Sequence, residues 1–429
     1  MKKIVQFAAI ALAACSFAHA QVVPEATGPV KLPLSGNLNY ALRYSQTAEF
    51  GGSLGDWQTG SISASVNYSN GTSRHPFNLN YGGGYTKTYT GPDYDTGVFQ
   101  HLSISQGLVG HKWNVGVSDS ISYTPESPTI GFSGVPGTGD PVGGSGSNPP
   151  SSQSVLTLNT RSIENTAAAQ IGYRIDYATT VNVGGDSNLL RYPDGNGLDT
   201  NGLGANAGLT RRINARNSLI GQFMYSRYDY SNQALDSGQG STSVPYPSSN
   251  IETATFGFQR VWGPKLQTTV SVGPQWISSS NAAIEPSSTT VAVNAAVNYS
   301  FRSESASLGY TRGASSGGGV LSGATVDSVY AGLSRGFGRN LTIGLTASYM
   351  RSDALELGGG AIDAVYGGAQ ATRQLGRYFS VFANYTAEDQ TSNQAAQASQ
   401  AAQPNVLGEF YQVIGFGIAF SPRETHLRR

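Results

Sequence analysis

The sequence predicts an all-β protein: a transmembrane, antiparallel, up-and-down β-barrel of about 18 strands, with roughly 16–18 as the range. From about residue 36 to residue 420 the chain repeats one unit. Two long runs of alternating polar and apolar residues are joined by a short turn, and a longer loop rich in Gly, Ser and Asn follows. Residues 341–349, Leu-Thr-Ile-Gly-Leu-Thr-Ala-Ser-Tyr, show the alternation clearly. Strands of globular proteins average about 5–6 residues, whereas runs of about 10 suit strands tilted across a bilayer.

Composition supports this fold class. Charged residues make up 12% of the chain, about half of the roughly 25% found in globular domains. Beyond the N-terminal segment, no stretch approaches the ~20 apolar residues of a membrane helix. A barrel explains both facts, because every second residue faces lipid and the others face a polar interior. The net charge of zero argues against nucleic acid as a partner.

The N-terminal segment 1–20 is typical of a secretory signal peptide. Lys2 and Lys3 precede an apolar stretch, and Ala18-His19-Ala20 forms an A-x-A cleavage site. The alternative is a lipoprotein signal at Leu12-Ala13-Ala14-Cys15, which would lipidate Cys15. We favour cleavage after Ala20, because the apolar Phe17 lies two residues after Cys15, where lipoproteins usually turn polar. Both readings export the chain. Residues 21–35 are then a linker too short for a plug domain, and residues 36–420 form the barrel.

The alternation divides the barrel into candidate strands separated by short turns and longer loops. The strands lie near residues 36–46, 57–69, 77–88, 97–109, 113–124, 166–177, 180–191, 201–213, 218–230, 251–262, 266–278, 289–301, 306–315, 324–337, 341–352, 362–375, 379–390 and 407–420. Short turns alternate with longer loops from about the fourth strand onward. This asymmetry is expected of barrels with short turns at one membrane surface and long loops at the other.

Several predicted strands end in the pattern x-Φ-x-Arg-x-Φ before a turn, where Φ is apolar. In this pattern Arg shares the lipid-facing side with apolar residues, so it is predicted to lie at the rim and reach lipid headgroups. At the bilayer midplane an Arg would cost about 2–4 kcal/mol, and close to nothing at the interface. The alternative, that Arg merely flanks turns, gives the same position. The predicted rim and aromatic girdle comprise Trp113, Arg211, Arg260, Trp262, Arg335, Phe337 and Arg373.

The inward rows are rich in Ser, Thr, Asn, Gln and Gly. The lumen-lining candidates are Arg43, Asn67, Asn80, Arg174, Asp176, Asp186, Gln267, Gln275, Asn294 and Asn298. Arg174 and Asp176 are predicted to share one strand face and to pair. About 18 strands leave an aqueous channel, and a lining without rings of one charge sign predicts weak ion selectivity. Two alternatives stay open: loops could instead close the lumen, and the long loop 125–165 either narrows the pore or caps the surface.

The final strand carries a recognisable ending. Gly415, Ile418 and Phe420 resemble the C-terminal assembly signal of outer-membrane proteins, except that a tail, 421–429, follows. With the leader and the short turns, the chain resembles Gram-negative outer-membrane porins. The Arg-x-aromatic strand ends, the Gly-x-Gly at 415–417 and Ser421-Pro422-Arg423 are similar to the β-barrel porin 2 type. The resemblance implies a pore-like protein of the cell outer membrane, with residues 21–35 and 421–429 in the periplasm.

These observations favour a passive channel for small polar solutes. The expected partners are outer-membrane lipid, small polar solutes and the barrel-assembly machinery, and a homo-oligomer is left open. The alternative from another class is a closed barrel that serves as a structural or polysaccharide-export accessory protein. The sequence does not name the solute.

An enzyme is the least favoured alternative. His101-Leu102-Ser103 resembles the His-x-Ser pair of lipid A deacylases, but the apolar Leu102 and Ile104 imply that His101 and Ser103 face the lumen. A lipid deacylase needs that pair toward lipid. No Gly-x-Ser-x-Gly elbow is present, and the histidines show no metal-ligand spacing. The sequence therefore predicts no enzyme, no catalytic or metal site and no cofactor.

Overall fold

The computed structural model describes residues 36–51, 56–70, 74–90, 97–124, 161–193, 198–231, 248–316, 323–392, 410–422 and 425–427. They belong to one compact unit, residues 35–428. Within these ranges the regular elements are strands, and no helix there is long and apolar enough to cross a membrane. The predicted signal peptide, the linker 21–35 and most of the loop 125–165 lie outside the described residues.

Nineteen strands follow one another along the described part of the chain. They are β1 (Gly36–Phe50), β2 (Trp57–Asn70), β3 (Phe77–Thr90), β4 (Gly97–Val109), β5 (Trp113–Thr124), β6 (Ser162–Arg174), β7 (Thr179–Arg191), β8 (Asp199–Arg212), β9 (Asn217–Ser231), β10 (Ser249–Val261), β11 (Leu266–Ser279), β12 (Ser288–Phe301), β13 (Glu304–Ser315), β14 (Ala324–Phe337), β15 (Leu341–Ala354), β16 (Ala361–Leu375), β17 (Phe379–Ser392), β18 (Phe410–Phe420) and β19 (Thr425–Leu427).

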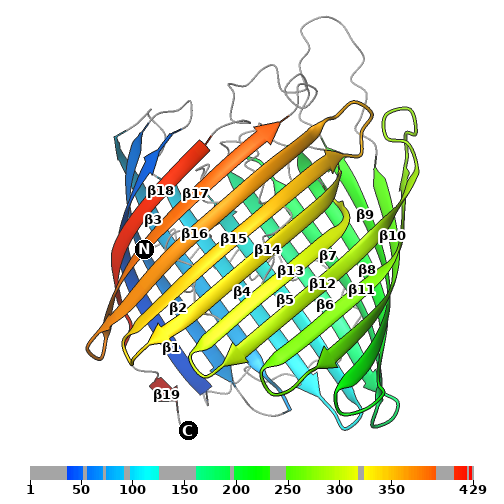
Figure 1. Cartoon of the computed structure of the whole chain (residues 1–429), viewed down its shortest axis with the longest axis horizontal. Coiled ribbons are helices and arrows are strands. Elements are labelled where there is room, and N and C mark those ends of the chain that lie inside the picture. Colours follow the sequence, from blue (N-terminus) through cyan, green and yellow to red (C-terminus); the bar gives the residue numbers. More distant parts are fainter. Residues whose placement is uncertain are drawn as a thin grey trace, which may run out of the picture. The chain divides into compact units, whose positions relative to one another are not determined.

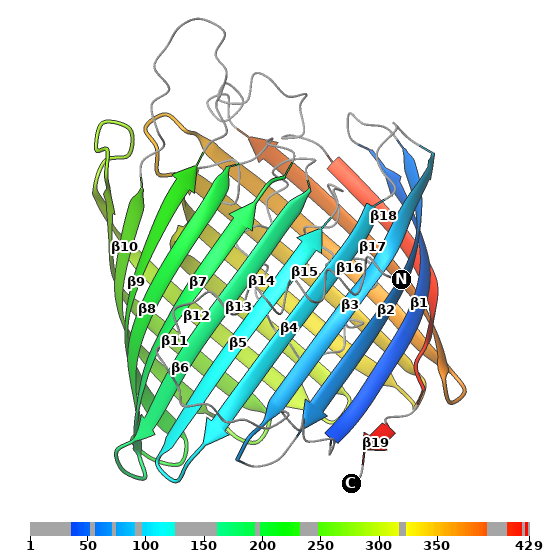
Figure 2. The ribbon, with the colours of Figure 1, turned by 180° about the vertical axis from the view of Figure 1, so that it is seen from behind.

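The first 18 strands form a closed antiparallel barrel. Each strand pairs with the next one in the chain, from β1–β2 to β17–β18. The ring closes because β18 pairs with β1, from Leu42 opposite Phe420 to Phe50 opposite Gln412. Figures 1 and 2 show the tilted strands from the two sides, with β1 in blue beside β18 in red. The predicted fold class is therefore confirmed.

Short turns gather at one end of the barrel, which we call the turn end; the opposite end is the loop end. At the turn end, side-chain oxygens accept hydrogen bonds from backbone amides that do not pair with a neighbouring strand. Asn214 Oδ1 accepts hydrogen bonds from the backbone amides of Arg216 and Asn217, both at 2.9 Å. Glycines at two turns, Gly338 and Gly376, adopt φ of 65° and 84°, which a side chain would disfavour. Local turn chemistry thus sets where these hairpins reverse.

Most predicted strand bounds differ from the observed ones by one to four residues, and one strand and the C-terminal tail differ in a way that matters for the argument. The strand predicted at 166–177 is β6, Ser162–Arg174, because residues 175–178 form a turn in which the Asp176 carboxylate accepts two backbone hydrogen bonds. The second difference concerns the tail 421–429, which the sequence predicts as a segment beyond the last strand of the barrel. Instead β19 pairs with the start of β1, with Gly36 opposite Leu427, and extends the β1–β18 seam.

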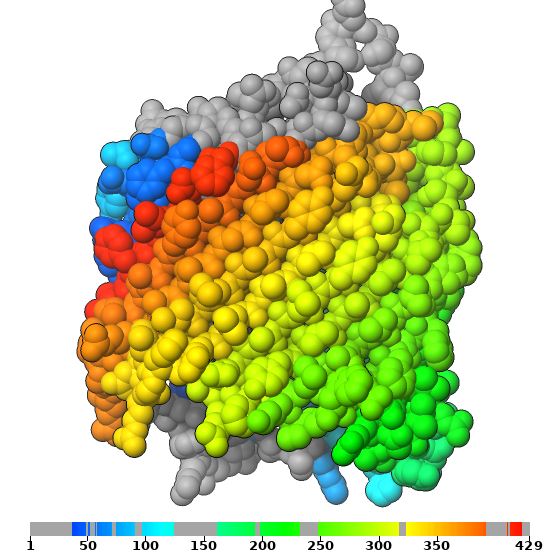
Figure 3. Space-filling model, viewed as in Figure 1, coloured from blue at the N-terminus to red at the C-terminus, as the bar shows by residue number. Residues whose placement is uncertain are grey.

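Side chains alternate between the two faces of the wall, as strand geometry requires. On the outer face, Tyr44, Ile62 and Tyr85 follow one another across β1, β2 and β3. On the inner face, Ser45 lies opposite Ser61. Outward apolar side chains are widely exposed, with 62% for Ile62 and 61% for Phe256. In Figure 3 the outer surface over β13–β17, in yellow and orange, consists of closely packed diagonal rows of side chains.

The inner wall is buried toward the loop end. Phe99, Ile277 and Met350 point inward and are only 1–2% exposed. Met350 packs with Ala324 and Ile362 in one apolar cluster. Nearer the turn end, inward residues such as Asn67 and Asn294 are exposed. Inward side chains are therefore buried at one level of the barrel and exposed at another.

Candidate functional site: the barrel interior

The inner wall is lined by hydroxyl and amide groups that bond across strands. Ser45 Oγ and Ser61 Oγ lie 2.6 Å apart, and Thr311 Oγ1 and Ser328 Oγ lie 2.8 Å apart. Thr47 and Thr59 bond in the same way. These pairs come from neighbouring strands at matching register. The alternating sequence therefore gives each strand one row of polar side chains that faces the barrel interior. Such a lining offers donors and acceptors to a polar solute without imposing one charge sign.

Most of the predicted lumen residues lie on inward rows. Asn67 lies opposite Asn80, and Gln267 lies opposite Asn298. Asn294 is on the same row as Asn298, since both are even-numbered residues of β12. Arg174 ends β6 at the turn end, opposite Thr180.

Two inward charges have close neighbours. The Arg43 guanidinium lies 5.0 Å from the centre of the Phe382 ring, an arrangement that stabilises a cation through the ring's electron-rich face. The Asp186 carboxylate occupies the space over Gly204, so a side chain at position 204 would require the carboxylate to move. The inner wall therefore carries charges of both signs, from Arg43 and Asp186, among its neutral polar side chains.

The structure corrects the predicted position of Asp176. It lies in the β6–β7 turn, so it does not share a strand face with Arg174 as predicted. Its Oδ1 accepts hydrogen bonds from the backbone amides of Ala178 and Thr179, at 2.6 and 2.7 Å. These bonds lower the pKa of the Asp176 carboxyl, the one from Ala178 most strongly. Its role is to shape the turn.

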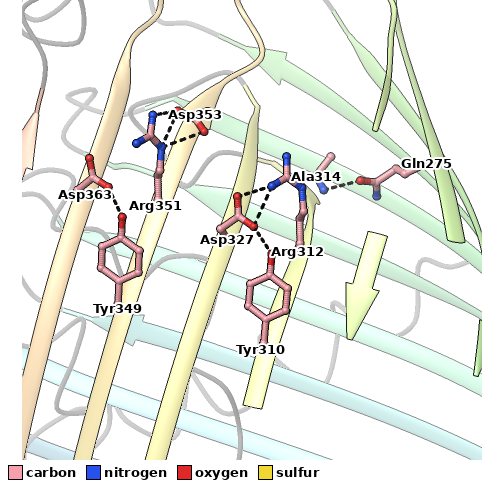
Figure 4. Close-up of polar contacts among 9 residues, drawn as sticks. All are labelled: Gln275, Tyr310, Arg312, Ala314, Asp327, Tyr349, Arg351, Asp353 and Asp363. Atoms are coloured by element: carbon pink, nitrogen blue, oxygen red, sulfur yellow. Dashed lines mark hydrogen bonds and ion pairs between the residues drawn. The ribbon is translucent and has the colours of Figure 1, made fainter. Parts of the chain in front are cut away.

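Gln275 links three strands across the inner wall near the loop end. Its Nε2 donates to Thr253 Oγ1 on β10 at 2.9 Å, and its Oε1 accepts from the backbone amide of Ala314 on β13 at 2.8 Å. Figure 4 shows the second bond. Although β12 begins at Ser288, its pairing with β13 stops at Val293. The Gln275 side chain therefore accepts a hydrogen bond from a backbone amide in the part of β13 that is not paired with β12.

The described loops at the loop end also contact one another. In the β11–β12 connection, residues 280–287, the carbonyl of Ile284 accepts from the backbone amide of Leu357 in the β15–β16 connection at 2.9 Å. The amide of Leu355 in turn donates to the Gly323 carbonyl, which precedes β14, at 3.1 Å. Since these connections belong to β11–β12, β13–β14 and β15–β16, they bridge a segment of the barrel rim. We call this group the loop bridge.

Glu285 anchors the loop bridge. Its side chain is fully buried, and its Oε2 accepts from Ser249 Oγ at 2.7 Å. Burial raises the pKa of the Glu285 carboxyl, and the nearby Glu356 adds to the increase. The hydroxyls of Ser249 and Ser279 act against that pKa increase, because they stabilise the anion.

Sequence reasoning missed Phe99 as part of the interior. It lies on the inward row of β4, opposite Gly84, and a side chain at position 84 would collide with its ring. The polar–apolar alternation did not predict that Phe99 faces inward, because Phe99 is an apolar residue on a row that is otherwise polar. The signal that could have found it is the pairing of a large residue with a glycine on the neighbouring strand.

The outer face carries charged and aromatic groups at both ends of the barrel. Near the loop end, Asp327 accepts hydrogen bonds from Tyr310 Oη at 2.7 Å and from Arg312 at 3.0 Å. On the neighbouring strands, Tyr349 Oη donates to Asp363 at 2.6 Å, and Arg351 pairs with Asp353 at 3.1 Å. Figure 4 shows both groups on adjacent strands.

The predicted rim residues lie at the turn end. The Arg260 guanidinium is 3.8 Å from the Trp262 ring centre, and Arg335 lies over Phe337 at 5.1 Å while pairing with Glu304 at 3.3 Å. The other members occupy outward register positions, Trp113 opposite Tyr173, Arg211 opposite Leu219 and Arg373 opposite Leu341.

On the inner wall, residue types that occur in catalytic relays lie side by side on β4, β5 and β6, but not in the order that a relay needs. His101 lies opposite Ser122, and Ser122 lies opposite Glu164, all on the inner wall. A nucleophile–base–acid relay needs the imidazole between the hydroxyl and the carboxylate, whereas here Ser122 is the middle residue. Within the same described ranges, no group of three or more metal-ligating side chains could hold a metal ion.

Comparisons with known proteins give fold-level likeness alone. No family model matches the sequence, and no curated protein matches it. Solved structures with related shape include Pseudomonas aeruginosa OccK2 (OpdF), at 11% identity and a TM-score of 0.45, covering 90% of this chain and 98% of that one. Acinetobacter baumannii OccAB3 gives 9% identity and a TM-score of 0.43, covering 90% and 99%.

The ferric citrate transporter FecA shows 13% identity and a TM-score of 0.43, covering 82% of this chain. This chain spans 60% of the length of FecA and 62% of the FrpB iron transporter from Neisseria meningitidis. At these identities and TM-scores, the neighbours carry no functional argument for this chain.

Proposed function

We propose that this chain is an outer-membrane channel that lets small polar solutes diffuse passively, with weak ion selectivity. The observation that carries the proposal is the opposite chemistry of the two faces of a closed 18-strand barrel. Outward rows are apolar and exposed, whereas inward rows are hydroxyls, amides and scattered charges. A barrel of this size leaves room for an aqueous path.

The outer face supports a position within a membrane. Exposed apolar side chains such as Phe256, Leu308 and Leu345 lie between a turn-end rim of Arg and aromatic residues and a loop-end rim of Arg, Asp and Tyr. Lipid tails solvate the apolar band, and the rims meet the headgroups. Since closed barrels of this kind belong to outer membranes, and the sequence predicts export, the outer membrane is the proposed location.

The inner face supports weak ion selectivity. Arg43 and Arg174 stand on the same wall as Asp186 and Glu164, among neutral amides and hydroxyls. Charges of both signs leave no ring of one sign, among the described residues, to repel co-ions or counter-ions. The width left beside the loop bridge, rather than charge, is therefore proposed to limit which solutes pass.

Reconstituted vesicles test the proposal directly. Vesicles holding the purified chain should swell in neutral sugars at rates that fall with sugar size. Planar bilayers should show discrete conductance steps with a reversal potential close to zero in a salt gradient. Vesicles made with heat-unfolded protein are the control. Absence of both swelling and conductance would exclude a channel.

The second candidate is a closed barrel with a structural or export-accessory role. The burial of inward Phe99, Ile277 and Met350 near the loop end is the observation that favours it. The same recordings separate the two functions, because a closed barrel inserts into vesicles without passing sugars. A lipid hydrolase is a third and weaker candidate, which would require ester hydrolysis that a His101→Ala variant loses.

A further inference from the structure

The short turns carry positive charge almost all the way around the turn end. Eight connections join strands there, and seven of them contain one Lys or Arg each. All seven side chains are exposed. We call these residues the turn cations; they are Arg74, Lys112, Arg216, Lys265, Arg302, Arg339 and Arg377. By sequence, the same eight connections contain one acidic residue, Asp176.

The turn that contains Asp176 is itself flanked by two arginines. Arg174 ends β6 and Arg212 ends β8, both on inward rows. The Arg212 guanidinium donates to the Tyr177 carbonyl at 3.2 Å, which holds it beside that turn. The Asp176 carboxylate accepts from the amides of its own turn. The turn-end mouth of the barrel therefore carries a net positive charge.

The inner wall toward the loop end carries acids instead. Glu164 lies two residues from the loop end of β6, and Glu388 lies four residues from the loop end of β17. Asp186 lies just past the middle of β7 on the loop-end side. All three occupy inward register positions. Among the inward side chains that the structure describes, no Lys or Arg lies in the loop-end half of a strand, since Arg43 is at the middle of β1.

The connections at the loop end continue this pattern. By sequence alone, the nine connections that join strands there hold ten Asp or Glu and one Lys or Arg. Those that fall within the described ranges are Asp56, Glu285, Glu356 and Arg161. Outward charges near this end occur largely as Arg–Asp pairs and add little net charge; the pairs are Arg227–Asp229, Arg312–Asp327 and Arg351–Asp353.

The chain is neutral overall, but its charge is divided between the two ends of the barrel. A mouth lined by one sign of charge raises the local concentration of ions of the opposite sign. The loop-end mouth should therefore collect cations, and the turn-end mouth should collect anions. Both fields extend into the lumen at low salt, because the screening length is about 10 Å at 0.1 M, and they are confined at 1 M, where it is about 3 Å.

We propose that this channel rectifies ion current, with the higher conductance when the loop-end side is positive. At that voltage, cations enter through the acidic mouth and anions enter through the basic mouth, so each ion comes from the mouth that concentrates it and the lumen fills with carriers. At the opposite voltage, each ion enters through the mouth that repels it, and the lumen is depleted. The inference rests on the proposed channel function. It agrees with weak ion selectivity, because the preferences of the two mouths oppose each other.

Single-channel recordings test this polarity. The purified chain is inserted into planar bilayers of phosphatidylcholine with equal KCl on both sides. In about 0.1 M KCl, the conductance at about 100 mV with the loop-end side positive should be about 1.5-fold or more above that at the opposite voltage. The ratio should fall to about 1 in about 1 M KCl, since salt then screens both mouths.

A label at the loop end gives the orientation of each channel. The sequence has one cysteine, Cys15, so Cys15→Ser gives a background without thiols. In that background Ala282→Cys places one thiol at an exposed position of the β11–β12 connection. After modification with a biotin maleimide, streptavidin changes the current only when the loop end faces the chamber to which it is added.

Charge reversal at the turn end tests the cause. Lys112→Glu/Arg216→Glu/Arg339→Glu reverses three turn cations and should bring the conductance ratio in about 0.1 M KCl to about 1. The matched control Lys112→Arg/Arg216→Lys/Arg339→Lys keeps every charge and should keep the ratio. Gel mobility of the unheated barrel checks that each variant folds. If the reversed variant does not fold, Glu164→Gln/Asp186→Asn removes two inward acids and should lower the ratio in the same way.

The outcomes separate this inference from the channel itself. Equal conductance at both signs of voltage, higher conductance with the turn-end side positive, or a ratio that survives about 1 M KCl or the charge changes would each overturn rectification and leave the channel standing. Complete absence of conductance would exclude the channel, and rectification with it.

Discussion

At the residue scale, the positions that break the polar–apolar alternation explain most of what is particular to this barrel. Phe99 is apolar on a polar row, and it fills the interior beside Gly84. Asp119 is charged on an apolar row, and it forms a polar pair with Asn165. The alternation sets the fold, and the residues that deviate from it determine local packing inside the barrel and local hydrogen bonds on its outer face.

A first prediction concerns Gly84. A Cβ at this position would overlap the Phe99 ring and the Ile62 carbonyl oxygen, so Gly84→Ala should lower the free energy of unfolding by about 1–3 kcal/mol through overpacking. Gly116 is the matched control, because it also points inward and a Cβ added there would meet no atom within 4 Å. Gly116→Ala should be neutral or stabilising by a few tenths of a kcal/mol. Urea unfolding in lipid vesicles compares the two, and equal stabilities would contradict the packing.

A second prediction concerns Glu285. Its pKa is raised in the folded loop bridge, so protonation favours the bridge. The contribution is fully present below the pKa of the unfolded chain and is lost as the pH rises through the folded pKa. Hydrogen-exchange protection of the Leu357 amide, which donates to Ile284, should therefore be higher at about pH 4, below the pKa of an unfolded glutamate, than at about pH 8, after correction for intrinsic exchange.

Glu285→Gln is the control for that pH effect, because glutamine keeps an acceptor for Ser249 but does not titrate. Tyr230 and Glu356 are the other titratable groups close to this carboxyl. The pH dependence should disappear in Glu285→Gln. If it persists, one of those neighbours, and not Glu285, controls the bridge.

At the element scale, strand positions followed from the sequence because each strand repeats a period of two over its whole length. The bounds of β4, β5 and β14 were predicted to the residue. The position of β6 was wrong, since alternation continues past Arg174 while Asp176 turns the backbone. Periodicity alone does not distinguish a strand residue from a turn residue whose side chain takes over the backbone amides.

Contacts between elements were less predictable than the elements. The rim position of Arg335 followed from its pattern, but its ion pair with Glu304 depends on the β13–β14 register. The Gln275–Ala314 bond depends on where β13 separates from β12. Neither the register nor the separation is encoded in a short motif. The sequence therefore predicted that Gln275 faces inward but did not indicate its hydrogen-bond partners.

A third prediction concerns this bond. Gln275→Ala removes the acceptor of the Ala314 amide and the donor to Thr253, and a buried group left unpaired costs about 1–3 kcal/mol. The loop-end part of β13 should therefore exchange its amide hydrogens faster, at Ala314 first. Gln267→Ala, on the same inward row near the turn end, should leave Ala314 unchanged. Exchange that is equally slow in both variants would show that other contacts hold the end of β13.

At the scale of the whole molecule, closure of the ring gives every strand two neighbours and leaves no open edge in the first 18 strands of the described chain. The seam is the step on which closure depends, because β1 and β18 are far apart in the sequence and must meet in register. β19 lengthens this seam at the turn end. Inside it, Arg43, Phe382 and Gly417 come together from β1, β17 and β18.

The last prediction addresses the seam. A side chain at Gly417 would overlap both the Phe382 ring and the Tyr44 carbonyl oxygen, which is backbone of the opposing strand and cannot move without disturbing the pairing. Gly417→Val should therefore reduce the folded fraction by at least roughly tenfold, which corresponds to ~1.4 kcal/mol. Gly367→Val is the control, since that glycine faces open space. Gel mobility before and after heating measures the closed barrel in each variant. A Gly417→Val chain that folds as well as Gly367→Val would show that the seam closes with more freedom than its packing indicates.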